Sequence, residues 1–141
     1  MRAKSSVAKA GTVVALLLLS SCATFSSSTD AALQSRVTGQ WTEFRKFDAC
    51  EEHHQRMAIR ADGTFEVKGR ATVCDKATEF TWGGTWQVKG GKFRYTTAYS
   101  EPPDFIPLGK TFEDAIVSDT DDEWVMIEQS TGNKSIARRV K

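Results

Sequence analysis

The sequence predicts an all-β domain: a single antiparallel, eight-stranded up-and-down barrel. Turn-forming residues recur at short intervals, as they do between the strands of a meander. Between the turns, short runs rich in threonine, valine and aromatic residues alternate between apolar and polar positions, which is the period of a half-buried strand. No segment of the domain shows the apolar stripe of an amphipathic helix. The turn signals are Asp62-Gly63, Gly90-Gly91, residues 119–122 and Thr131-Gly132-Asn133.

Residues 1–21 have the pattern of a secretory signal peptide. An apolar run covers residues 11–19, and it is too short to cross a bilayer, which takes roughly 20 apolar residues. The run ends in Leu19-Ser20-Ser21-Cys22, which resembles a bacterial lipobox. The resemblance implies that a diacylglycerol is attached to Cys22 and that cleavage occurs before it. The alternative is an ordinary secretory signal in which the cysteine is incidental. Three basic residues precede the run: Arg2, Lys4 and Lys9.

Cleavage changes the charge of the chain and defines its domains. Without the signal the chain keeps 16 basic and 18 acidic residues, a formal charge of −2, which gives no case for binding nucleic acid. Residues 22–35 are small and polar, so we expect a lipid-anchored flexible tether with at most a helical turn. Residues 36–141 form the barrel domain. Ala23 follows the cysteine, and the sorting rule of Gram-negative lipoproteins then implies the outer membrane, facing the periplasm.

Eight strands are expected in the domain, and sequential pairing with closure removes the exposed edges of an open sheet. A barrel of eight strands either packs solid or holds one small ligand. Phe93, Tyr95 and Tyr99 are expected to share one face of the fifth strand, whereas residues 123–129 are apolar on both faces and should be well covered. The expected strands are residues 38–45, 55–61, 64–73, 79–89, 92–99, 111–118, 123–129 and 134–140.

The first strand carries a Gly-x-Trp sequence at residues 39–41. This sequence resembles the opening motif of the lipocalin and avidin (calycin) barrels, and the domain most resembles the small lipocalin-like domains of bacterial lipoproteins. The resemblance implies that Trp41 closes one end of the barrel and that an arginine of the last strand stacks on its ring. Arg138 is the expected partner because it has the same parity as Ile136 and Val140. The alternative is a β-sandwich of another kind.

Cys50 and Cys74 are expected to form a disulfide. They follow the first and third strands, and in a meander these loops lie at the same end. An exported protein also meets an oxidising compartment. The alternative is a metal site that adds His53 and His54, but the spacing matches no standard zinc pattern. Adjacent histidines on a strand also point to opposite sides of the sheet.

The same end of the barrel receives the longest loop, residues 100–110, which contains three prolines. One possibility is that its apolar residues form an exposed lip around a ligand mouth. The other is that the loop folds down and closes the barrel, with Phe105 as a core residue. The candidate mouth residues are Phe47, His53, Phe105, Ile106 and Leu108.

No catalytic set is found: the sequence has no nucleophile elbow and no phosphate-binding glycine loop. The acidic residues 119–123 lack the pattern of an EF-hand loop. We therefore expect no enzyme, cofactor or metal. The leading hypothesis is a lipid-anchored, non-enzymatic binding protein of the bacterial cell envelope that holds a small apolar ligand or lipid. The alternative is a protein-interaction lipoprotein with a solid barrel, such as an envelope assembly accessory or a periplasmic hydrolase inhibitor.

Overall fold

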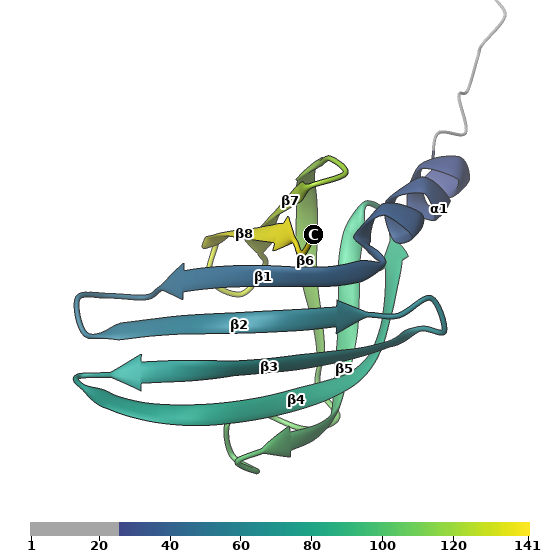
Figure 1. The fold of residues 1–141 in the computed structure, drawn as a ribbon. Coiled ribbons are helices and arrows are strands. Elements are labelled where there is room, and N and C mark those ends of the chain that lie inside the picture. The colour runs from purple at the N-terminus through teal and green to yellow at the C-terminus, as the bar shows by residue number, and fades with distance from the viewer. Residues whose placement is uncertain (1–25) are drawn as a thin grey trace, which may run out of the picture.

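The computed structural model describes residues 26–141, in which eight antiparallel strands close into a barrel (Figure 1). Each strand pairs with its neighbour in sequence, and β1 also pairs with β8, which closes the sheet. The predicted fold class is confirmed. The expected signal peptide, its cleavage site and Cys22 lie outside the described residues. The elements are α1 (Ser26–Val37), β1 (Gly39–Lys46), β2 (Glu51–Ile59), β3 (Thr64–Val73), β4 (Lys76–Lys89), β5 (Lys92–Glu101), β6 (Thr111–Asp119), β7 (Glu123–Glu128) and β8 (Lys134–Arg139).

The strands form where the sequence alternates, and their inward residues make one continuous core. On β3, Phe65 and Val67 are buried, while the side chain of Lys68 is exposed on the outer face. β2 begins at Glu51, four residues before the expected start, because His53 and Gln55 extend the inward row of Met57 and Ile59 towards the disulfide. The core is rich in aromatic rings, including Trp41, Phe65, Phe80, Trp86, Phe93 and Trp124.

A bulge between β4 and β5 changes which residues face inwards. Gly83 pairs with Tyr99 and the register shifts at the next residue, so that Ala98 is the extra residue of β5. A one-residue insertion reverses the parity of the side chains beyond it. Tyr99 therefore lies outside the barrel, where its hydroxyl donates a hydrogen bond to Glu66 at 3.1 Å. The expectation that Tyr99 shares the inner face with Phe93 was wrong for this reason.

Residues 26–37 form a helix, although a flexible tether is expected from the sequence up to residue 35. α1 packs on the end of the barrel through Leu33 and Val37, which are buried and one helical turn apart. Asp30 accepts hydrogen bonds from the backbone amides of Gly90 and Gly91 in the β4–β5 turn, at 2.8 and 2.9 Å. The tether prediction was thus wrong for residues 26–35, and the folded domain begins before residue 36. Within residues 26–141, no helix is both long enough and apolar enough to cross a membrane.

Candidate functional site

One end of the barrel is closed by Trp41 and Arg139. The Trp41 ring is fully buried, and the guanidinium carbon of Arg139 lies 4.1 Å from its centroid. Arg139 also donates hydrogen bonds to the carbonyl oxygens of Arg36 at 2.6 Å and Thr38 at 3.1 Å. Carbonyl groups at the end of a helix have no partner within the helix, so Arg139 caps α1 while it covers the tryptophan.

The choice of Arg138 as the partner of Trp41 was wrong by one residue. The Arg138 side chain is 69% exposed and lies 3.4 Å from Glu123 on the outer face. The inward residues of β8 are the small Ser135 and Ala137, which are buried. The larger Ile136 lies on the outer face, so the apolar side chains of this strand indicate the wrong parity.

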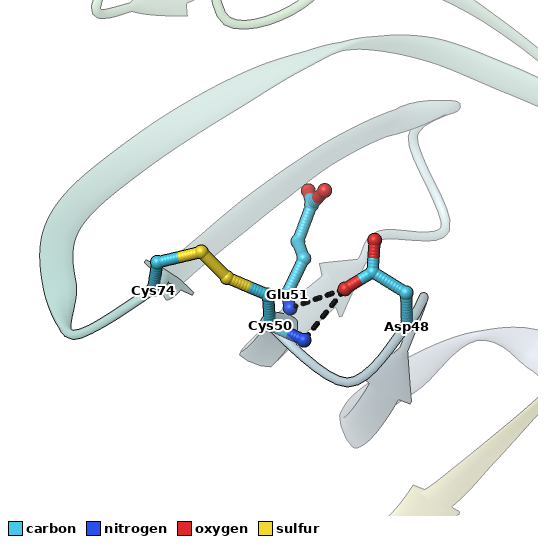
Figure 2. Close-up of a disulfide and its surroundings, with 4 residues drawn as sticks. All are labelled: Asp48, Cys50, Glu51 and Cys74. Atoms are coloured by element: carbon cyan, nitrogen blue, oxygen red, sulfur yellow. Dashed lines mark hydrogen bonds between the residues drawn. A yellow bond between two sulfur atoms is a disulfide. The ribbon is translucent and has the colours of Figure 1, made fainter.

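The opposite end is fixed by the predicted disulfide, which the structure confirms (Figure 2). The Cα atoms of Cys50 and Cys74 are 4.7 Å apart, and the Cys74 amide donates to the Cys50 carbonyl at 2.8 Å. Asp48 accepts hydrogen bonds from the amides of Cys50 and Glu51, at 2.7 and 2.8 Å, which holds the β1–β2 loop (Figure 2). The bridge therefore ties the β1–β2 loop to the β3–β4 turn at the end where the mouth was expected.

An aromatic cover, formed by Phe47, His53, Phe80 and Phe105, lies over this end. The rings of Phe80 and Phe105 are stacked with centroids 4.2 Å apart. His53 contacts the other three rings, at 4.6 Å from Phe47, 5.8 Å from Phe80 and 5.9 Å from Phe105. The loop has thus folded over the barrel with Phe105 packed against the core, as in the second of the two sequence-based alternatives.

The other expected mouth residues lie around this cover. Ile106 is half-buried, whereas Leu108 is 54% exposed and Phe47 keeps an exposed edge. His54 points away from the cover to the outer face, where its ring lies 4.6 Å from that of Phe44. Only part of the expected apolar lip is therefore exposed.

Four charged side chains face into the barrel beneath the cover: Glu43, Arg45, Asp114 and Glu128, called here the interior cluster. Arg45 forms ion pairs with Glu43, at 3.0 Å, and with Glu128. The amide nitrogen of Gln55 also donates to Glu43 at 2.6 Å. Glu43 is 5% exposed, so its charge depends on these partners rather than on water.

Asp114 is the member of the interior cluster without a cationic partner in the described chain. It is 8% exposed, and it accepts hydrogen bonds from the Tyr95 hydroxyl and the backbone amide of Gln129. Burial raises the pKa of Asp114 to about 6, with Arg45 lowering it and Glu43 raising it. The pKa of Tyr95 is also raised, first by burial and then by the neighbouring Asp114.

A cavity of about 40 Å³ lies between the interior cluster and the apolar core. A cavity of this size has room for a water molecule or a small polar group. Ser135 lines it and is 3% exposed, and its hydroxyl has no hydrogen-bond partner within residues 26–141. The remaining lining is amphipathic: Glu43, Arg45, Gln55, Tyr95 and Asp114 on the polar side, and Met57, Ile59, Phe65, Val67, Trp82, Phe93 and Met126 on the apolar side.

The fold is lipocalin-like. Its eight strands form a closed meander, and the Trp41–Arg139 pair lies at the closed end. No protein-family model matches the chain, and no curated protein does. Among solved structures the chain is similar to a lipocalin-like protein from Bacteroides uniformis, with 15% identity and a TM-score of 0.48, over 74% of this chain and 99% of that one.

The lipocalin-like barrel also carries a groove of about 770 Å³ on its outer face, across β1 to β4 and β8. The exposed ring of Phe44 lies in this outer groove, beside His54. The outward-facing Glu79 is an acidic residue that lines the outer groove, and its carboxylate lies 3.9 Å from the guanidinium of Arg70. The basic residues of the outer groove are Arg56, Lys68, Arg70, Lys134 and Arg138.

The sequence did not reveal the interior cluster as a site. Glu43 and Arg45 follow Trp41 at alternate positions, so their inward parity could have been derived from the tryptophan. Asp114 and Glu128 are cross-strand partners of β6 and β7, and that pairing depends on the bulge of β6 near Val117. No turn residue marks this bulge, so these two carboxylates could not be placed inside from the sequence.

Proposed function

We propose that this chain is a lipid-anchored, non-enzymatic binding protein of the bacterial cell envelope whose barrel holds a small ligand. The observation that carries the proposal is the cavity that Glu43, Arg45 and Asp114 of the interior cluster line together with apolar core residues. A buried ion costs several kcal/mol in desolvation, and apolar residues of the same size often stabilise a core better than buried ion pairs do. Charged residues around a cavity at one end of a barrel are therefore better explained by binding than by stability.

The lining of the cavity supports a ligand with two chemically different parts. The polar side offers carboxylates and the Ser135 hydroxyl, which has no hydrogen-bond partner among the described residues. The apolar side is formed by core residues such as Phe65 and Trp82. The small apolar ligand expected from the sequence therefore needs a polar head group. A ligand larger than a few atoms also requires Phe105 to move away from Phe80, and the aromatic cover would then serve as the gate.

The lipid anchor rests on the Leu19-Ser20-Ser21-Cys22 sequence. We expect Cys22→Ser to abolish lipid attachment and to shift the protein from the membrane fraction to a soluble or uncleaved form. Fractionation with mass spectrometry of the N-terminal peptide measures both effects. A variant that stays lipidated and membrane-bound would contradict the anchor, and wild-type protein in the inner-membrane fraction would contradict the outer-membrane location alone.

The binding function is tested by native mass spectrometry of the full protein purified from its own cells. A small molecule released on denaturation, at a constant ratio to protein, is the expected result. Phe105→Ala should speed the loss of that molecule during dialysis because the stacked ring over Phe80 is removed. Leu108→Ala, in the same loop but exposed, is the matched control and should leave the rate unchanged.

A second candidate is a protein-interaction lipoprotein with a filled barrel, and the small volume of the cavity favours it. The outer groove, with Phe44 among basic residues, would then contact an acidic partner in the envelope. This candidate predicts that the purified protein carries no small molecule and is retained by one stoichiometric partner. Arg56→Glu should release that partner, because Arg56 lies in the groove and has no acidic partner in the described chain.

A further inference from the structure

We infer that the interior cluster binds the ammonium group of a primary amine, with the apolar body of the amine directed towards the aromatic cover. The inference rests on the proposed function, because it names the head group of the ligand held in the barrel. The cluster holds three carboxylates, and Arg45 is its one cation. Arg45 lies between Glu43 and Glu128, so Asp114 remains as a carboxylate that a ligand can pair with.

The arrangement favours an organic cation over a metal ion. No three histidine, cysteine, aspartate or glutamate side chains of residues 26–141 converge closely enough to hold a metal. An ammonium group instead forms separate hydrogen bonds to acceptors that lie apart, because it has three donors and no acceptor. Asp114 and Ser135 line the same cavity, and Ser135 offers a buried oxygen that has no partner within the described residues.

The size of the cavity and the donors that it requires limit which head groups can bind. At about 40 Å³, it has room for a small head group such as a protonated methylamine. A quaternary ammonium group has no N–H donor, so it would leave the Ser135 hydroxyl unpaired. The apolar body would lie along Tyr95 and Trp82, whose rings are 5.8 Å apart, and aromatic faces also attract a cation.

The protonation of Asp114 gives an additional expectation. The groups that face it are Glu43 and Arg45 on β1, Tyr95 on β5 and Glu128 on β7. Because burial raises the pKa of Asp114 to about 6, this carboxyl is mostly neutral at pH 5 and mostly ionised at pH 7.5. An alkylamine stays protonated at both values, so affinity should fall at the lower pH.

Calorimetry on the full purified protein tests the inference with three probes of one length: n-butylamine, n-butanol and butyrate. We expect n-butylamine to bind at least tenfold more tightly than n-butanol at pH 7.5, and butyrate not to bind. Asp114→Asn should remove that preference. Glu113→Gln is the matched control, because Glu113 lies beside Asp114 in sequence but pairs with Arg94 at 2.6 Å on the outer face. It should leave binding unchanged.

A second variant keeps the test valid if Asp114→Asn does not fold. Ser135→Ala removes one oxygen from the cavity, and we expect it to weaken the binding of n-butylamine about threefold to tenfold, with a smaller effect on n-butanol. Equal or tighter binding of n-butanol or butyrate would overturn the inference and leave the proposed function standing. If none of the probes binds, the inference fails; if purified protein also carries no small molecule, the proposed function fails with it.

Discussion

At the scale of single residues, Arg139 stabilises the closed end through two kinds of contact. Its removal leaves the carbonyl oxygens of Arg36 and Thr38 without a donor and uncovers Trp41. We expect Arg139→Ala to lower the free energy of unfolding by about 2–4 kcal/mol. Arg138→Ala should cost about 0.5 kcal/mol or less, because that side chain is exposed.

Denaturant unfolding of the two arginine variants makes this comparison directly. The fluorescence of the tryptophans provides a second readout, since the surroundings of Trp41 should become more polar when Arg139 is removed. Equal and small losses for both variants would show that the stacking contributes no stability.

Asp114 should make the protein less stable as the pH rises, whereas a salt-bridged carboxylate makes a protein more stable as the pH rises. Its pKa is about 6 in the folded protein, against about 3.9 in an unfolded chain. Between these values the folded state binds more protons than the unfolded state, so stability falls as pH rises from about 4 to about 6. We expect Asp114→Asn to be more stable than wild type at pH 7.5, by up to ~3 kcal/mol, and equal to it near pH 4.

Urea unfolding at pH 4 and pH 7.5 measures this difference, with Glu113→Gln as the control on the outer face. Subtracting variant from wild type at each pH removes the contributions of the other acidic groups. If the free energies of unfolding of Asp114→Asn and wild type differ by the same amount at pH 4 and pH 7.5, the raised pKa of Asp114 is contradicted.

At the scale of elements, the disulfide holds the loops that carry the mouth. It joins residues 24 apart in sequence, so in the chain-entropy model it contributes about 3.5 kcal/mol. We expect the Cys50→Ser/Cys74→Ser double variant to lose roughly this amount, and thiol labelling of the wild-type domain to require a reductant. Two thiols of residues 50 and 74 that react without reductant would rule out the bond in solution.

Helix α1 should behave as part of the domain rather than as a linker. Leu33 is buried against the end of the barrel, and we expect Leu33→Ala to destabilise the protein by about 2 kcal/mol. Ala32→Ser, on the exposed side of the helix, is the control and should lower the free energy of unfolding by only a few tenths of a kcal/mol. If hydrogen exchange shows the amides of residues 30–37 unprotected, the helix does not dock.

The elements that the sequence predicted are those determined by local signals. Alternation and Gly-containing turns identify strands such as β3 and β4, since both signals lie within a few residues. Helix α1 was not predicted because its apolar contact is formed by Leu33 and Val37, and two residues are too few to show a helical period. Tyr99 and Arg138 were placed on the wrong face, the first because of a bulge and the second because Ser135 and Ala137 carry little apolar signal.

At the scale of the whole molecule, the barrel combines a rigid closed end with an interior that costs stability. The closed end is held by α1, Trp41 and Arg139, so the first and last elements of the domain are joined there. The interior cluster lies towards the other end, where the cover depends on ring contacts of Phe105. This division suits the proposed binding function, in which the wall would stay fixed while the loop that carries Phe105 moves.

The position of α1 determines how the protein would stand on a bilayer. The helix covers the closed end (Figure 1). In the sequence, three residues separate Cys22 from the first helical residue, Ser26. If lipid is attached to Cys22, the closed end is held at the bilayer surface and the aromatic cover points into the aqueous space. A ligand would then arrive from solution or from a soluble carrier, and would not be drawn directly from the lipids beneath the protein.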